Sequence, residues 1–511
     1  MFKNYFLVLL VSISFQTLTQ SQTPCTSGTA GNYPCKDYDL MSRVPISTMA
    51  TNNADGSDIW GWTDPLDGKE YAIVCTSNST AFVDITDPVN PVFLGRIETA
   101  NGRTNVWRDA KVYNNHVFIV ADGVSNHGMQ VFDLTILRNG VDADLTYNGS
   151  QVLRYRGDGG SGDLVIGSCH NIVINEFEGI AYLVGCSSAN GGGPIFVDIT
   201  NPANPTVLGD YTNGGYSHDA QVVTYTGPDK DYYDPANGIT GRQIYIGSNG
   251  NTDKVVILDV TNKNNIIEIN DFDYPQTAYA HQGWFTEDQR YFLLGDELDE
   301  QNFGVNTRTF IFDFSDLDGN FNLDSDNNNL PDLIKIYEGT TRAIDHNGYV
   351  KGGNYFLANY RAGLRVLDVR TLLSANNSNA EIGFFDTYPG SNSGNFNGAW
   401  SVYPYFESGN IIISDIERGL FVVRKSNTLS TPEFELQTNF TISPNPTNSF
   451  STVKTDNGKI YSIEIHSILG QKIYSKNNIN TQKFVLPTKN YTPGVYLIKI
   501  NNLVTKKLVV K

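Results

Sequence analysis

The sequence predicts an all-β protein built mainly from one repeat. Short runs of β-branched and aromatic residues alternate with turns rich in Asp, Asn, Pro and Gly, the composition of strands and tight turns. No comparable stretch has the periodicity of an amphipathic helix. A strand ending in an aliphatic residue, Asp and another apolar residue recurs along the chain. Its copies are AFVDITDPVNPVFLGRI (81–97), MQVFDLTIL (129–137), IFVDITNPANPTVLGDY (195–211), VVILDVTNKNNIIEI (255–269), TFIFDFSDL (309–317), LRVLDVRTL (364–372) and a truncated FVVR (421–424).

A second marker precedes each copy and sets the size of the repeat. Reading the segments in register predicts that seven residues share one position. They are Trp60, Arg108, His170, His218, His281, His346 and Asn397. Successive markers are 48 to 65 residues apart, which is enough for the four strands and loops of a propeller blade. The sequence therefore predicts a seven-bladed β-propeller over residues 38–425.

The start of this region predicts how the ring closes. The last repeat has strands near Ser401, Ile411 and Phe421 but lacks an outer fourth strand. Residues 40–44 (LMSRV) resemble the fourth-strand segment 93–97 (FLGRI). We expect the N-terminal strand to complete the last blade, because such closure removes two exposed sheet edges.

The first residues predict export. Lys3 precedes an apolar run at 6–15, and a polar stretch with small residues follows at 19–21. The run is shorter than the roughly 20 residues that a membrane-spanning helix needs. We expect residues 1–21 to be a cleaved signal peptide. A lipoprotein cut at Cys25 is the less favoured alternative, because residues 22–24 make a poor lipobox.

The five cysteines suggest two disulfides and one free thiol in an exported chain. Cys25 and Cys35 lie close together in the Gly/Pro-containing segment 22–37 and are expected to pair. Cys169 and Cys186 flank a candidate hairpin and could pair across it. Cys75 would then be free.

Further motifs recur where strands of the repeat begin or end. They are Trp107-Arg108-Asp109, Ser168-Cys169-His170-Asn171, His218-Asp219-Ala220-Gln221, His281-Gln282-Gly283-Trp284, Asp296-Glu297-Leu298-Asp299-Glu300, Asn359-Tyr360-Arg361-Ala362-Gly363-Leu364 and Ser414-Asp415-Ile416-Glu417-Arg418-Gly419-Leu420. With them, residues 38–425 resemble the choice-of-anchor B family, which is related to the LVIVD-repeat propellers. The resemblance implies a propeller joined to a surface-anchoring module, and it implies no particular activity.

The chain ends in a different module. A polar linker is expected at 426–436, followed by short alternating strands in 437–511, enough for a small β-sandwich. Four motifs of this module are ISPNP (442–446), LGQK (469–472), GVYLIK (494–499) and KKLVVK (506–511). They resemble the type A sorting domain of type IX secretion, which implies the secretion machinery as a partner and an extracellular or outer-membrane-surface location. A carbohydrate-binding sandwich is the alternative, weakened by the absence of Trp.

The charge is unevenly distributed. The chain carries a net charge of −18, and ten Lys against one Asp and one Glu give residues 437–511 a balance of +8. The remainder therefore carries −26 (−18 minus 8). Nucleic-acid backbones require clustered Lys and Arg, so this acidic body argues against them as partners. Solubility is the simplest explanation of the excess.

The repeated histidines predict a metal site. If the marker opens the innermost strand, these side chains surround the mouth of the central channel. Neutral imidazoles that converge are common ligands of Zn, Cu or Fe, and carboxylates from the ends of second strands could join them. The predicted ligands are His170, His218, His281, His346, Asp296 and Glu297. The alternative is structural, because a repeat can reuse a polar residue to hydrogen-bond neighbouring strands.

The same mouth is predicted to bind a ligand. Arg108 would suit an anionic group, and Trp60, Trp107 and Trp400 are the accompanying aromatic candidates.

An acidic loop predicts a separate calcium site. Asp324, Asp326 and Asn328 place oxygen atoms at alternate positions, and Asp332 follows. Ca²⁺ binds several oxygens from one flexible loop, and this loop resembles those of thrombospondin type 3 repeats. An ordinary solvated turn is the alternative.

The leading functional hypothesis is a surface-displayed propeller that binds an extracellular glycan, peptide or small ligand, by analogy with the fold. The alternative is a metal-dependent enzyme that uses the histidine ring. A scaffold in surface assemblies is a third possibility. Neither an H-E-x-x-H motif nor a P-loop occurs to indicate an enzyme class.

Overall fold

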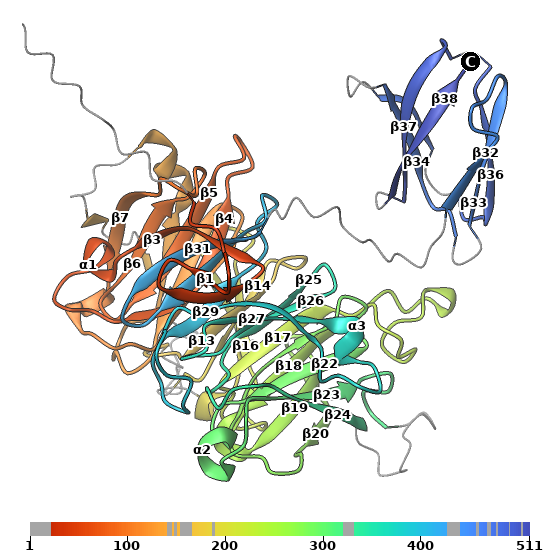
Figure 1. Ribbon diagram of the computed structural model, residues 1–511. Helices are drawn as coiled ribbons and strands as arrows, with labels where there is room; N and C mark the ends of the chain where they lie inside the picture. Colours follow the sequence, from red (N-terminus) through yellow and green to blue (C-terminus); the bar gives the residue numbers. More distant parts are fainter. Residues whose placement is uncertain are drawn as a thin grey trace, which may run out of the picture. The chain divides into compact units, whose positions relative to one another are not determined.

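The computed structural model is almost entirely β-structure (Figure 1). It describes residues 22–140, 146–147, 151–153, 166–186, 190–319, 332–426, 440–455, 459–467, 472–476, 479–489, 491–501 and 504–511. The chain divides into two compact units, residues 1–426 and 427–511. The predicted signal peptide and most of the predicted linker lie outside the described residues. No helix among the described residues is long and apolar enough to cross a membrane.

The larger unit consists of seven sheets, each containing four antiparallel strands in a meander. The first three are β4 (Gly56–Thr63), β5 (Glu70–Thr76), β6 (Ser79–Asp84) and β7 (Val92–Glu98); β8 (Arg108–Tyr113), β9 (His116–Ala121), β10 (Met129–Asp133) and β12 (Gln151–Leu153); and β13 (Asn171–Asn175), β14 (Ile180–Val184), β15 (Ile195–Asp198) and β16 (Thr206–Asp210). A short strand, β11 (Thr146–Tyr147), pairs in parallel with β7.

The next three sheets follow the same order. They are β17 (Asp219–Thr224), β18 (Gln243–Asn249), β19 (Lys254–Asp259) and β20 (Ile267–Phe272); β21 (Ala280–Phe285), β22 (Tyr291–Asp296), β23 (Arg308–Asp313) and β24 (Asp332–Glu338); and β25 (Gly348–Lys351), β26 (Asn354–Ala358), β27 (Leu364–Asp368) and β28 (Glu381–Phe385). The predicted aliphatic-Asp pattern falls on the third strand of each sheet, where its apolar residues are buried.

The seventh sheet contains both ends of the unit. It combines β29 (Ala399–Tyr403), β30 (Asn410–Asp415) and β31 (Gly419–Lys425) with β3 (Tyr38–Val44). β3 pairs antiparallel with β31, from Tyr38 opposite Lys425 to Val44 opposite Leu420. This is the strand that the resemblance between residues 40–44 and 93–97 predicts.

The first strands of the seven sheets form a closed ring. In the described chain, β4 contacts β8, and the contacts continue in order through β13, β17, β21, β25 and β29 back to β4. This is a propeller-like arrangement, with one strand of each sheet innermost. The apolar core lies between neighbouring sheets; for example, Phe356 and Phe385 of the sixth sheet share a cluster with Val402 and Phe421 of the seventh.

The N-terminal segment forms structure that the sequence did not indicate. β1 (Thr29–Ala30) and β2 (Tyr33–Lys36) form a hairpin, and β2 extends the sixth sheet by pairing with β28. Cys25 and Cys35 are disulfide-bonded, as predicted, so the bond ties this hairpin to its approach segment.

Three short helices interrupt the strands: α1 (Ile46–Met49), α2 (Asp299–Phe303) and α3 (Val369–Leu372). Helix α2 follows β22 and ends at Gly304, whose positive φ of 69° suits a helix C-terminus. It carries the last residues of the Asp296–Glu300 motif.

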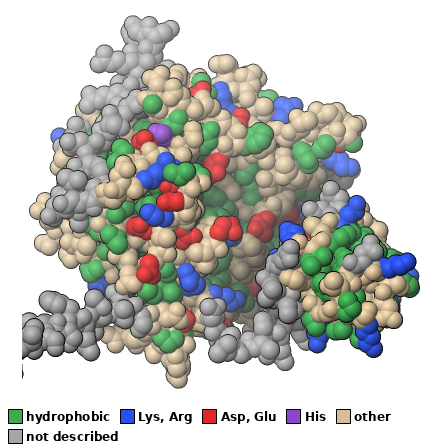
Figure 2. Space-filling model, turned by 90° about the horizontal axis from the view of Figure 1, so that it is seen from above, with side chains coloured by type: hydrophobic (Ala, Val, Ile, Leu, Met, Phe, Trp, Pro, Cys, Tyr) green, Lys and Arg blue, Asp and Glu red, His purple; other side chains and the backbone are tan. Residues whose placement is uncertain are grey.

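The C-terminal unit contains two sheets. β32 (Phe440–Ser443), β33 (Phe450–Thr455) and β36 (Lys483–Pro487) form one; β34 (Ile463–Ser467), β35 (Lys472–Lys476), β37 (Gly494–Ile500) and β38 (Val504–Val510) form the other. One apolar cluster joins them, with Val453 and Leu486 from the first and Ile465 and Ile498 from the second. Lys side chains mark the surface of this unit in Figure 2.

Candidate functional site: a histidine recess at one end of the ring

Four histidines lie side by side where four consecutive first strands begin. His170 and His218 directly precede β13 and β17, His281 is the second residue of β21, and His346 lies two residues before β25. The ring centroids are 4.2 Å apart for His170 and His218, 4.3 Å for His218 and His281, and 4.3 Å for His281 and His346. The structure therefore brings all four predicted histidines together.

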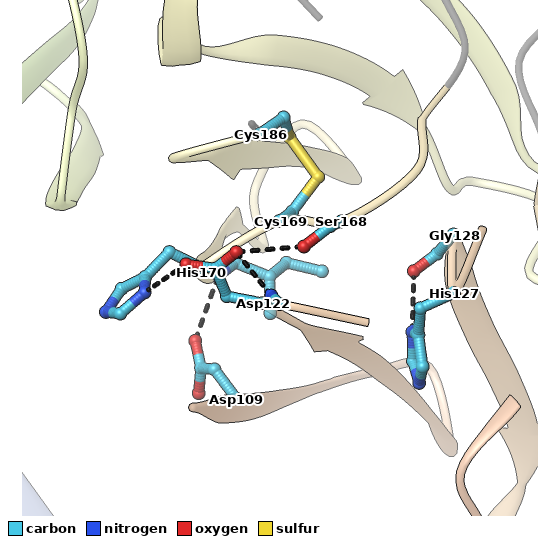
Figure 3. Close-up of a disulfide and its surroundings, with 10 residues drawn as sticks. Asp109, Asp122, His127, Gly128, Ser168, Cys169, His170 and Cys186 are labelled. Carbon is cyan, nitrogen blue, oxygen red and sulfur yellow. Dashed lines mark hydrogen bonds and ion pairs between the residues drawn. A yellow bond between two sulfur atoms is a disulfide. The ribbon is translucent and has the colours of Figure 1, made fainter. Parts of the chain in front are cut away.

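Two of these histidines have a defined tautomer. His218 Nδ1 lies 3.2 Å from the carbonyl oxygen of His281, and His170 Nδ1 lies 3.1 Å from Asp122 Oδ2 (Figure 3). Both partners accept, so each Nδ1 carries a hydrogen; burial keeps His218 neutral, so its Nε2 has a lone pair. Asp122 is itself fixed by the Ser168 hydroxyl at 2.8 Å and the Gly123 amide at 2.6 Å.

The other two histidines share a carboxylate. His281 Nε2 lies 3.7 Å from Glu297 Oε2, and His346 Nε2 lies 3.6 Å from Glu297 Oε1. One nitrogen of each imidazole and one oxygen of Glu297 lie within 4.8 Å of one another. His281 is 1% exposed, and neither of its ring nitrogens has a hydrogen-bond partner among the described residues. Leaving a buried polar group unpaired is costly.

Burial determines the protonation states of the histidines and of Glu297. It lowers the pKa of His281 and of His218 well below the usual value, further helped by the neighbouring imidazoles, and it lowers the pKa of His346 to about 3. These histidines are neutral at pH 7 and offer lone pairs. Burial also raises the pKa of Glu297 to about 7, although the hydrogen bond from Tyr360 opposes the rise.

Tyr360 positions Glu297. Its hydroxyl donates to Glu297 Oε1 at 2.9 Å. The Tyr360 backbone has a φ of 23°, a region that bulky residues seldom occupy. Such strain is tolerated where the surrounding structure fixes the residue, and here Tyr360 O accepts the amides of Gly363 and Ala399.

The histidines line a recess with aromatic walls. A cavity of about 440 Å³ is bounded by His281, His346 and Glu297 together with Trp107, Tyr360 and Trp400. A second cavity of about 240 Å³ shares Trp107, His170, His218 and Glu297 with it and extends toward Asp122. We call the two together the histidine recess. Trp107 and Trp400, two of the predicted ligand-binding residues, thus line the histidine recess.

Two other predicted site residues do not face this recess. Asp296 is buried and accepts hydrogen bonds from the Tyr274 hydroxyl and from the amides of Ala278 and Tyr279. Its carboxylate therefore stabilises its own loop, and the prediction of Asp296 as a metal ligand is wrong; only Glu297 joins His281 and His346. Asn359, directly after β26, does not face the recess either, because its amide donates to the Thr307 hydroxyl and to the carbonyl of Ala343.

Arg108 is likewise buried rather than open to a ligand. Its Nε donates to the carbonyl of Thr76 at 3.1 Å, and Nη1 lies 3.1 Å from His127 Nε2. Burial lowers the pKa of the guanidinium to about 10. Arg108 lines neither cavity of the recess, so its predicted role as the anion-binding residue of the mouth is wrong.

The register predicted for Trp60 and Asn397 is also wrong. β21 bulges at His281, between Ala280 and Gln282, and β29 bulges in the same place at Trp400, between Ala399 and Ser401. Trp400, not Asn397, therefore occupies the histidine position of the last sheet. Trp60 lies deeper in β4, opposite Ile73, and lines a different cavity.

The remaining cysteines behave as predicted. Cys169 and Cys186 form a disulfide beside His170 (Figure 3), and Cys75 is free and buried. The disulfide joins the segment entering β13 to the segment leaving β14, next to the residue that begins the recess.

The predicted calcium site stays a prediction. Asp324, Asp326 and Asn328 lie outside the described residues, and Asp332 begins β24. Asp316 and Asp318 lie just before the loop, and their carboxylate oxygens lie within 4.8 Å of each other and of a carboxylate oxygen of Asp229, from the segment between β17 and β18. Asp229 and Asp316 accept the amides of Leu317 and Gly319, so these two carboxylates also fix the local backbone.

Asp122 directly follows β9, the second strand of its sheet, at a position where the sequence predicts carboxylates that could join the histidines. A further contributor to the recess, Tyr360, was not singled out from the sequence as a site residue. Tyr360 lies within the Asn359–Leu364 motif, but its contact with Glu297 joins residues 63 apart, and no local pattern reveals such a contact.

Comparisons with known proteins identify one part of the chain. Residues 441–511 match the family of secretion system C-terminal sorting domains. The chain is therefore handled by type IX secretion, which exports proteins to the cell surface or beyond. No curated protein matches the chain. Among solved structures, the β-propeller domain of Myceliophteria thermophila Cps50 (Swd1) is similar over 70% of this chain and 93% of its own length, with 10% identity and a TM-score of 0.41.

Proposed function

We propose that this exported protein is a surface-displayed seven-bladed propeller that binds an extracellular ligand in the histidine recess. The closed order of the first strands and the pairing of β3 with β31 support seven blades. The two C-terminal sheets with one shared core support a β-sandwich sorting domain. The resemblance to the choice-of-anchor B family fits a large domain carried to the surface by a separable module.

The ligand is held through a divalent transition metal bound by His281, His346 and Glu297. The buried imidazole of His281, which has no hydrogen-bond partner among the described residues, carries this proposal, because it faces the carboxylate that His346 also approaches. Two neutral imidazole nitrogens and one carboxylate oxygen suit Zn²⁺ or Fe²⁺ better than Ca²⁺ or Mg²⁺, which prefer oxygen. Tyr360 would orient the carboxylate, as outer partners of metal ligands do.

Three protein ligands leave coordination positions open for a ligand. His218 turns an unprotonated Nε2 away from its Nδ1 partner and can accept a hydrogen bond from the ligand, and His170 lies beside it. Trp107 and Trp400 supply apolar wall area. The recess thus fits a small oxygen-bearing group, such as the carboxylate of a peptide or acidic sugar.

A metal-dependent enzyme is the second candidate, favoured by the Asp122–His170 pair. A carboxylate that holds Nδ1–H of a histidine leaves Nε2 free to accept a proton, and a bound metal could activate water beside it. Replacement of Asp122 by Asn distinguishes the two functions: it would reduce turnover of a substrate strongly but leave metal content and simple ligand affinity nearly unchanged.

Elemental analysis of the purified full chain tests the metal. We expect about one equivalent of transition metal after dialysis, reduced at least tenfold by His281→Ala and by the more conservative Glu297→Gln. His116→Ala is the matched control, because His116 lies at the opposite end of β9 from the recess. Wild-type metal content in both recess variants would refute the site, as would a folded chain that never retains added Zn²⁺ or Fe²⁺.

A further inference from the structure

The opposite end of the same strands carries a second cavity. Trp60 and Trp284 are each the fifth residue of their strands, β4 and β21, and Tyr403 is the last residue of β29, whereas the histidines lie where such strands begin. The cavity has a volume of about 460 Å³ and shares no lining residue with the histidine recess. We call it the aromatic cavity.

Its walls are aromatic rings set at steep angles to one another. Trp60 and Tyr403 have centroids 5.1 Å apart at 67°, and Tyr403 and Tyr405 are 5.4 Å apart at 73°. Trp284 completes the wall and packs at 76° against the buried Tyr349. The edge of one ring therefore packs against the face of the next, so the rings surround the cavity in a fixed arrangement instead of stacking in parallel.

One of these rings, that of Trp60, already contacts a cation of the protein itself. Lys111 Nζ lies 4.5 Å from the centroid of Trp60. The ammonium group is also 2.5 Å from Asp109 Oδ1 and 3.9 Å from Asp58 Oδ2. Lys111, which itself lines the cavity, is thus paired with buried carboxylates, and Asp109 offsets its charge.

The rim of the aromatic cavity is negative. Glu176, exposed directly after β13, is its only acidic lining residue. Other carboxylates lie near the tyrosines: burial first, and then the charges of Glu176 and Glu70, raise the pKa of Tyr403. Burial, the neighbouring Tyr403, and the charges of Glu287 and Glu176 raise the pKa of Tyr405, although a hydrogen bond from Trp284 opposes the rise. Aromatic faces beside a carboxylate favour cations over anions.

We infer that the aromatic cavity binds an organic ammonium group, such as a quaternary ammonium ligand or the side-chain ammonium of a lysine. Ring faces attract such a cation through their quadrupoles, and Glu176 adds charge at the entrance. This site is independent of the histidine recess and needs no metal.

Calorimetry on the full chain tests the inference with tetramethylammonium and choline as probes. Their neutral isostere 3,3-dimethylbutan-1-ol and the disaccharide cellobiose serve as comparison ligands. We expect saturable binding of both cations, at least tenfold weaker for the neutral alcohol and absent for cellobiose. Trp284→Ala should weaken cation binding at least tenfold, and Glu176→Gln about threefold.

Phe450→Ala is the matched control, because Phe450 is an exposed aromatic residue of β33 in the C-terminal unit, and it should leave cation affinity unchanged. Glu176→Gln keeps the inference testable if Trp284→Ala fails to fold. No binding of either cation, or equal binding of the neutral alcohol, overturns the inference. Binding of cellobiose in place of the cations would make the cavity a sugar site and overturn it equally.

Discussion

His127 makes the stability of the large unit sensitive to acid. Its Nδ1–H donates to the carbonyl of Gly128 at 2.9 Å (Figure 3), so Nε2 faces Arg108 unprotonated. Burial, and then the charge of Arg108, lowers the pKa of His127 to about 3. Between pH 6.5 and 3 the unfolded chain binds a proton that the folded chain excludes, so stability falls as pH falls through this window.

Over the step from pH 7 to pH 5 this histidine alone should remove about 2 kcal/mol of unfolding free energy, at about 1.4 kcal/mol per pKa unit. Urea titrations at the two pH values measure the loss. His127→Gln, which cannot be protonated, should show a smaller loss by that amount. An identical loss in both proteins would contradict the role given to His127.

At the scale of single residues, the sequence showed which residue types recur at the site, but it did not show which residues each of them contacts. The four histidines were found because one residue type recurs where first strands begin. Trp60 was misplaced because β4 contains a register shift between Gly56 and Ile59, which a pattern of apolar residues does not reveal. Arg108 was expected to bind an anionic group at the mouth of the channel, but a backbone carbonyl and a neutral imidazole hold it inside.

At the scale of elements, the disulfide between Cys169 and Cys186 should both stabilise its sheet and position His170. The two residues are 17 apart in sequence, and closing a loop of about this length is worth about 3 kcal/mol. The double variant Cys169→Ala/Cys186→Ala should lose about that much in denaturant titrations. It should also bind metal or ligand more weakly, since His170 follows Cys169 directly. Unchanged stability would show that packing alone holds the two segments together and that the disulfide adds no stability.

The closing strand β3 could be predicted because it repeats the residues of a fourth strand. The β1–β2 hairpin could not, because its two strands are short and β2 pairs with β28, about 350 residues away. Helix α2 was missed for a related reason: five residues are too few to show helical periodicity.

At the scale of the whole molecule, export and folding should be separable. The chain forms two compact units, and only residues 441–511 match the sorting-domain family. Removal of residues 437–511 should leave the large unit folded but trapped before the outer membrane. Cell fractionation followed by immunoblotting measures this, with a signal-peptide deletion as the control that stays in the cytoplasm. A truncated chain that still reaches the surface would contradict the assignment.

The reversal of charge at residue 437 made this division visible in the sequence, because two independently folding units need not share a composition. The identity of the proposed ligand left no such trace, because the recess is assembled from side chains on several different sheets.

The central claim is that the histidine recess holds a metal, and anomalous X-ray diffraction from crystals of the full chain grown with Zn²⁺ tests it most directly. We predict one strong peak about 2.0–2.2 Å from nitrogen atoms of His281 and His346 and from an oxygen of Glu297. The peak should be absent from Glu297→Gln crystals grown in the same way. A Zn²⁺-saturated crystal with no peak among these three residues would contradict the claim.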